Sequence, residues 1–149
     1  MAKVEASAEG TIDAPADKVY SYIADMRIHQ QILPPAFSGF QVEEGGVGAG
    51  TVTRFTITAG GRTREYHMRI AEPEPGRTLT ETDAGSSLVT TFNVDPRGEK
   101  SLVRITTNWD GASGIGGFFE RTFAPRALHS IYLEALERLN KYAVEHRTA

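Results

Sequence analysis

Three polar side chains of this sequence, Arg64, Tyr66 and Glu81, are the residues whose types and spacing best suit chemistry. Arg64 and Tyr66 are two positions apart in a stretch of alternating character, so in a strand both would lie on the same face as neighbouring apolar residues. A guanidinium can stabilise an enolate oxygen, a phenol can donate a proton, and a carboxylate can act as a base. The three groups therefore suit acid–base chemistry on a carbonyl compound, and they equally suit polar contacts to a bound molecule.

Other common kinds of catalytic centre are not indicated. The chain has no cysteine, which excludes disulfides, thiolate metal sites and thiol nucleophiles. Its histidines, His29, His67, His129 and His146, are isolated and show no metal-ligand spacing, so we expect no metal and no other cofactor. For His29 the sequence favours a solvent-exposed or helix-capping role.

The chain has 149 residues, with 16 basic and 19 acidic side chains and a formal net charge of −3. This length fits one domain over residues 1–149. The mild negative charge argues against nucleic-acid binding, which normally requires a basic face.

No apolar run approaches the roughly 18 residues of a membrane span, and the polar N-terminus does not resemble a signal peptide. We expect a cytoplasmic protein without an integral membrane segment, and the sequence carries no signal for a particular oligomeric state.

Apolar residues repeat with a period of two over most of the chain, which predicts strands. The first strand covers Lys3–Ile12. Six more are expected between short turns rich in glycine and proline: Gly39–Glu44, Thr51–Ala59, Arg62–Glu72, Arg77–Asp83, Ser87–Asp95 and Ser101–Trp109. Two short helices should follow the first strand, one beginning at Pro15 and one over Arg27–Leu33. A glycine-rich stretch, Gly111–Gly117, could act as a connector or a gate before a long helix from Pro125 to about His146.

Seven antiparallel strands and one long helix predict an α+β, helix-grip arrangement. A sheet has two faces, and a single long helix can cover one of them. Strong curvature lets the sheet wrap around the helix, so that the two apolar surfaces bury each other. Because such a grip does not close tightly along its whole length, we expect an internal cavity between sheet and helix.

The hairpin around Gly60-Gly61 predicts which side chains face this cavity. A two-residue turn there pairs Phe55 with Tyr66 and Thr53 with Met68. The same alternation along later strands, with the apolar stripes of the helices, gives the candidate ligand-binding residues: Tyr22, Phe55, Arg64, Tyr66, Met68, Glu81, Thr90, Phe92, Thr107, Trp109, Leu128 and Tyr132.

Each of these residues also has a purely structural explanation. Arg64 is near a hairpin end, where its stem can lie on apolar surface while the guanidinium reaches water. Glu81 is equally well explained by a structural hydrogen-bond network and by a ligand contact. Aromatic and helix-stripe residues pack in protein cores more often than they contact ligands.

Several turns and helix starts resemble those of a known family. They are Ile12-Asp-Ala-Pro-Ala-Asp-Lys-Val-Tyr20, Ile-Leu-Pro-Pro at 32–35, Gly45-Gly-Val-Gly-Ala-Gly-Thr51, Ala71-Glu-Pro-Glu-Pro-Gly-Arg77 and Phe-Ala-Pro-Arg-Ala-Leu at 123–128. With the order of elements, they resemble the SRPBCC superfamily of START-like, helix-grip proteins, in particular its bacterial polyketide cyclase/dehydrase and lipid-transport group. The resemblance covers essentially the whole chain. It implies a cavity that binds lipids, sterols, quinones or polyketides, and it supports the architecture better than any one activity.

Three functions follow as alternatives. The first is binding or transport of a hydrophobic small molecule such as a lipid, a quinone or a polyketide. The second is a polyketide aromatase/cyclase, in which Arg64 stabilises an enolate, Tyr66 donates a proton and Glu81 acts as base. The third is an interaction module, such as a quinone-binding chaperone or a toxin-like regulator, that acts through its surface. A Glu81 carboxyl with a raised pKa in a closed pocket, within hydrogen-bond reach of Tyr66, would favour chemistry. A direct Glu81–Arg64 pair, or both groups in water, would favour binding or structure.

Overall fold

The computed structural model describes residues 3–59, 61–111 and 124–146. Along the chain they form β1 (Lys3–Ile12), α1 (Ala16–Ala24), α2 (Met26–Ile32), β2 (Phe37–Glu44), β3 (Val52–Ala59), β4 (Arg62–Glu74), β5 (Thr78–Asp83), β6 (Val89–Arg97), β7 (Lys100–Asp110) and α4 (Ala124–His146). This is the predicted order, and the bounds agree with the sequence analysis to within two residues. The glycine-rich stretch expected before the long helix lies, apart from Gly111, outside the described residues.

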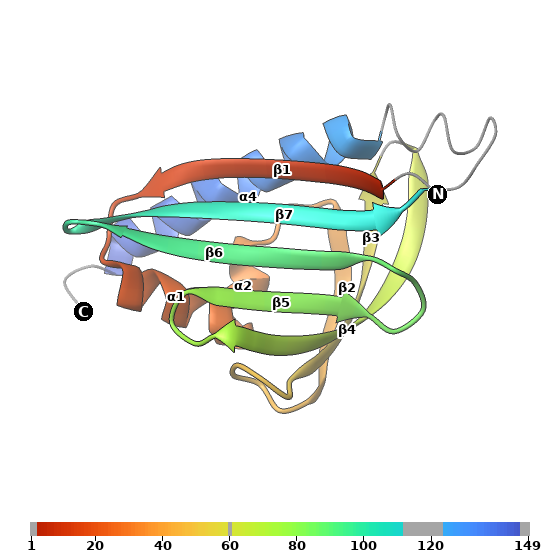
Figure 1. The fold of residues 1–149 in the computed structure, drawn as a ribbon, viewed down its shortest axis with the longest axis horizontal. Helices are drawn as coiled ribbons and strands as arrows, with labels where there is room; N and C mark the ends of the chain where they lie inside the picture. Colours follow the sequence, from red (N-terminus) through yellow and green to blue (C-terminus); the bar gives the residue numbers. More distant parts are fainter. Residues whose placement is uncertain (1–2, 60, 112–123, 147–149) are drawn as a thin grey trace.

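The seven strands form one antiparallel sheet in the order β1-β7-β6-β5-β4-β3-β2. In Figure 1, β5, β6 and β7 lie side by side across the picture, whereas β2 and β3 turn steeply away from them. The sheet thus curves around α4, which runs along β1, while α1 and α2 lie at one end of the sheet. The predicted helix-grip architecture is confirmed.

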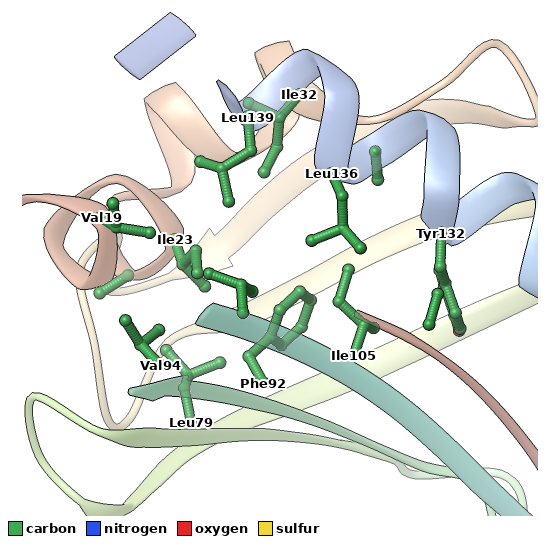
Figure 2. Packing of buried hydrophobic residues seen from close by; sticks show 14 of the residues in the cluster. Val19, Ile23, Ile32, Leu79, Phe92, Val94, Ile105, Tyr132, Leu136 and Leu139 are labelled. Carbon is green, nitrogen blue, oxygen red and sulfur yellow. The ribbon is translucent and has the colours of Figure 1, made fainter. Parts of the chain in front are cut away.

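The predicted hairpin register is also confirmed, since Phe55 lies opposite Tyr66 and Thr53 opposite Met68. Because side chains alternate along a strand, this register commits the apolar residues of β3 and β4 to the concave face. The same face of β5, β6 and β7 carries buried apolar side chains. Figure 2 shows Tyr132, Leu136 and Leu139 of α4 facing Phe92 and Ile105 of the sheet.

Several strand ends differ from the prediction by one or two residues, and the end of β6 shows why. The sequence analysis ended the sixth strand at Asp95, whereas β6 continues through Pro96 and Arg97, which lie opposite Ser101 and Lys100. Proline is tolerated there because β6 pairs with β5 only as far as Asn93. Beyond Asn93, no β5 residue lies opposite β6 to accept the hydrogen bond that the missing proline N–H would donate. The turn is correspondingly short, and Gly98 adopts a φ of 65° in it.

The loop between β2 and β3 is connected to α1 and the sheet by hydrogen bonds to Glu72 of β4. One Glu72 carboxylate oxygen accepts a hydrogen bond from the Tyr20 hydroxyl at 2.7 Å. The other accepts from the Ala49 backbone N–H at 2.8 Å. Glu72 therefore joins α1, the loop and the sheet at the end of the molecule where the short helices lie.

Gly48 is required for the hydrogen bonds of Glu72, and its replacement by alanine should destabilise the fold by more than the backbone strain alone. Gly48 has a φ of 67°, and an added Cβ would lie 2.4 Å from the Glu72 Oε1 atom. The variant therefore loses the Glu72 hydrogen bonds in addition to adopting an unfavourable left-handed conformation. We expect a loss of about 2–4 kcal/mol in the free energy of unfolding, measured by urea denaturation.

Gly50→Ala is the matched control. Gly50 also has a positive φ, of 89°, but an added Cβ meets no atom within 4 Å. This variant should cost only the backbone strain, about 1–2 kcal/mol. Equal losses in the two variants would show that the Glu72 contacts contribute nothing to stability.

Candidate functional site

An internal cavity lies between the concave face of the sheet and the helices α2 and α4. Its walls are mainly apolar, and it leaves about 40 Å³ for the centres of water-sized molecules. Nine of the predicted ligand-binding residues line it: Phe55, Tyr66, Met68, Glu81, Thr90, Phe92, Thr107, Leu128 and Tyr132. They meet because β3 to β7 each place alternate side chains on the concave face and α4 covers that face.

The other three predicted residues lie elsewhere. Arg64 and Trp109 line a second, more open hollow of about 380 Å³ beside the cavity, at the β3–β4 hairpin and the first turns of α4. The two spaces share four wall residues, Ile57, Tyr66, Leu88 and Leu128. We call the second hollow the mouth. Tyr22 lies outside both spaces and packs edge-on against Tyr142, with 5.0 Å between ring centroids.

Arg64 reaches solvent, as its position at a hairpin end suggested. Its side chain is 55% exposed, and its Nη2 atom lies 3.8 Å from Asp83 Oδ2. The guanidinium also lies over the Tyr66 ring, 5.3 Å from the centroid. Arg64 therefore pairs with Asp83 and not with Glu81.

A polar row crosses the otherwise apolar cavity floor. Glu81 of β5 lies opposite Thr90 of β6, which lies opposite Thr107 of β7. The two threonine hydroxyls are hydrogen-bonded at 2.7 Å, and Thr107 is also hydrogen-bonded to the Tyr132 hydroxyl of α4. Burial raises the pKa of Tyr132 to about 12, so this phenol is neutral at physiological pH. These three hydroxyl groups bond one another inside the core.

His29 is a cavity residue that the sequence analysis assigned wrongly to solvent or to a cap. It is 2% exposed and lines the cavity. Its Nδ1 atom lies 2.8 Å from the Ile23 carbonyl oxygen, which can only accept, so Nδ1 carries the proton. A signal was present in the sequence: His29 lies midway between Met26 and Ile32 at three-residue spacing, on the stripe of α2 that is buried.

Glu81 is the buried carboxyl of the cavity. Its side chain is 6% exposed, and its Oε1 atom lies 3.7 Å from His29 Nε2. It makes no hydrogen bond to any residue that the structure describes. Burial raises the pKa of the Glu81 carboxyl, and the nearby His29 opposes that shift. Glu81 and His29 thus form a buried pair inside the cavity, separated by more than the length of a hydrogen bond.

The sequence reasoning also missed several apolar wall residues, among them Phe37 and Ala135. Within the described ranges, no three histidine or acidic side chains are close enough to share a metal ion. Among the helices described, none is both long and apolar enough to cross a membrane.

A curved antiparallel sheet that grips a long helix and encloses a mainly apolar cavity defines the helix-grip class of ligand-binding folds. Within that class, the chain belongs to the polyketide cyclase/dehydrase and lipid transport family, whose sequence model matches residues 1–144. The resemblance seen in the sequence is therefore confirmed.

Solved structures agree with this assignment. The KanY protein, determined by NMR, is 40% identical, with a TM-score of 0.84 over 95% of this chain and 98% of that chain. The protein TTHA0849 from Thermus thermophilus is 20% identical, with a TM-score of 0.79 over 95% and 97% of the two chains. Zhui aromatase/cyclase from Streptomyces sp. R1128 is 16% identical, with a TM-score of 0.76 over 99% and 97%. The last two show a shared fold. A search of curated proteins finds no match.

Proposed function

We propose that this protein binds, and in doing so carries, a hydrophobic small molecule such as a lipid, a quinone or a polyketide in the cavity between the sheet and α4. The observation that carries the proposal is the buried Glu81 carboxyl, which lines an apolar cavity without a hydrogen bond to any described residue. The nearest charged neighbour, His29, is 3.7 Å away, and burying a carboxyl without a hydrogen bond costs several kcal/mol. A core built for stability alone would hold an apolar residue there, whereas a binding site needs a polar anchor.

The volumes of the cavity and of the mouth suit a ligand that occupies both. The cavity's 40 Å³ is enough for a few water molecules. The mouth adds about 380 Å³ and shares four wall residues with the cavity. A ligand with a narrow polar end in the cavity and an apolar body in the mouth fits this shape. Tyr66, half-buried at the boundary, would contact the middle of such a ligand.

Exposure of the protein to a total lipid extract, followed by native mass spectrometry, tests the proposal. We expect a bound species and a raised Tm with members of a hydrophobic ligand panel. A ligand at 100 times its Kd adds about 2.7 kcal/mol of stability. For a chain of this length that is a Tm increase of about 5–10 °C. Recovery of no ligand, together with an unchanged Tm across the panel, would exclude binding in the cavity.

The second candidate is an aromatase/cyclase, and the observation that favours it is the Glu81–His29 pair inside the cavity. A carboxyl with a raised pKa beside an imidazole is suited to taking a proton from a carbonyl compound and returning it. The exposed position of Arg64, near Asp83, weakens its proposed role at an enolate oxygen. Unchanged turnover of a poly-β-keto substrate in Glu81→Gln and Arg64→Met would eliminate both proposed roles.

A further inference from the structure

We propose that the cavity selects ligands whose polar end is a neutral hydroxyl group, on an alcohol or a phenol, and that this hydroxyl binds between Glu81 and His29. The proposal rests on the proposed function, because it names the chemical class of the molecule bound there. Glu81 of β5 and His29 of α2 bind the polar end, and the apolar walls of the cavity contact the rest of the ligand.

The spacing of the pair suits one bridging oxygen. The 3.7 Å between His29 Nε2 and Glu81 Oε1 exceeds the length of a hydrogen bond, which is about 2.7–3.2 Å. An oxygen displaced to one side of the line between the two atoms can lie about 2.8 Å from each of them. Both side chains are almost fully buried, at 2% and 6% exposure, and both line the cavity. A ligand atom therefore reaches the pair from within the cavity.

A hydroxyl satisfies the pair wherever its proton lies. The Ile23 carbonyl keeps a proton on Nδ1 of His29, so Nε2 is the ring nitrogen left to bond a ligand. If Nε2 is protonated and Glu81 is ionised, the imidazolium donates to the ligand oxygen and the carboxylate accepts the ligand O–H. If Glu81 holds the proton, the carboxyl donates to the ligand oxygen and Nε2 accepts the ligand O–H. In each state the hydroxyl donates once and accepts once.

Other polar ends are less well matched. A ketone or an ether can only accept, so it leaves one member of the pair without a partner. A carboxylate would bring a second acid beside Glu81, and its burial would require the pair to take up another proton.

Three other hydroxyl groups of the cavity are already engaged with one another. Thr90, Thr107 and Tyr132 already bond one another in a chain. Glu81 is therefore the member of the polar row that has no hydrogen bond to a described residue and can take a ligand as its partner.

A matched ligand series at neutral pH tests the inference: 2-naphthol, naphthalene and 2-naphthoate share a ring system and differ in the polar end. Affinities can be measured by calorimetry. We expect 2-naphthol to bind at least tenfold more tightly than either of the others. In Glu81→Met, which removes the carboxyl and keeps the volume similar, the affinities for 2-naphthol and naphthalene should become equal. The wild-type series decides the question by itself if this variant does not fold.

Glu43→Met is the matched control, because Glu43 also lies beside a histidine, His67, but on the outer face of the sheet. It should keep the hydroxyl preference. Equal binding of 2-naphthol and naphthalene by the wild type, tighter binding of 2-naphthoate, or recovery from a lipid extract of a ligand without a hydroxyl overturns the inference and leaves the proposed function standing. No binding in the series and none from the extract overturns both.

Discussion

Replacing Ala135 with leucine should reduce the affinity for any cavity ligand at least a hundredfold while the protein stays folded. Ala135 is 4% exposed and lies on the face of α4 that closes the cavity, between Tyr132 and Leu139. Three added carbon atoms would occupy a space of about 40 Å³ that the ligand needs. Leucine is a good helix former, so the helix itself should not suffer. Overpacking costs typically about 1–3 kcal/mol, which is the destabilisation we expect.

Calorimetry with a ligand identified in the panel measures the loss of affinity, and urea denaturation measures the stability. Ala127→Leu is the control, because Ala127 is half-buried on the same helix but lines neither the cavity nor the mouth. It should keep wild-type affinity. Full affinity in Ala135→Leu would mean that the ligand binds somewhere other than this cavity.

Replacing Glu81 with glutamine should make the protein more stable than the wild type, and the advantage should grow as the pH rises above about 4.5. In the unfolded chain the Glu81 carboxyl ionises near its ordinary pKa of 4.5, whereas burial raises its pKa in the folded protein. Between the two values the folded state holds a proton that the unfolded state has released, so the stability of the wild type falls with rising pH. The loss is about 1.4 kcal/mol per pH unit in that interval. Glutamine does not titrate, so the variant lacks this contribution.

The titratable groups facing Glu81 are His29 from α2 and, more weakly, Tyr132 from α4. A protonated His29 opposes the shift and reduces the slope. Urea denaturation of both proteins across a pH series measures the difference, and Glu43→Gln, which removes a carboxylate on the outer face, is the control. A stability difference between Glu81→Gln and wild type that does not change with pH would contradict a raised pKa at Glu81. A stabilised variant would fit a residue kept for function at the expense of stability.

Periodicity and turn chemistry in the sequence were enough to predict the strands, their antiparallel arrangement and the register of the β3–β4 hairpin. The reason is local: alternation commits a whole strand to one face, and a short turn fixes which residues lie opposite each other. The positions of Phe55, Tyr66 and Met68 on the concave face therefore followed from the sequence. The family and the helix-grip fold followed from turns and helix starts that resemble those of known members.

The sequence by itself thus determined on which face of the sheet each strand side chain lies, and only the tertiary structure decided which side chains meet. Arg64 and Glu81 share a face, yet Arg64 reaches out to Asp83 at the hairpin end, and Glu81 lies beside His29 from a helix distant in the chain. Strand alternation says nothing about depth along the sheet or about how α2 packs against it. A histidine on a short helix is buried or exposed according to that packing. The pairing of Glu81 with His29, and with it the chemistry of the cavity, is therefore a product of how separate elements dock.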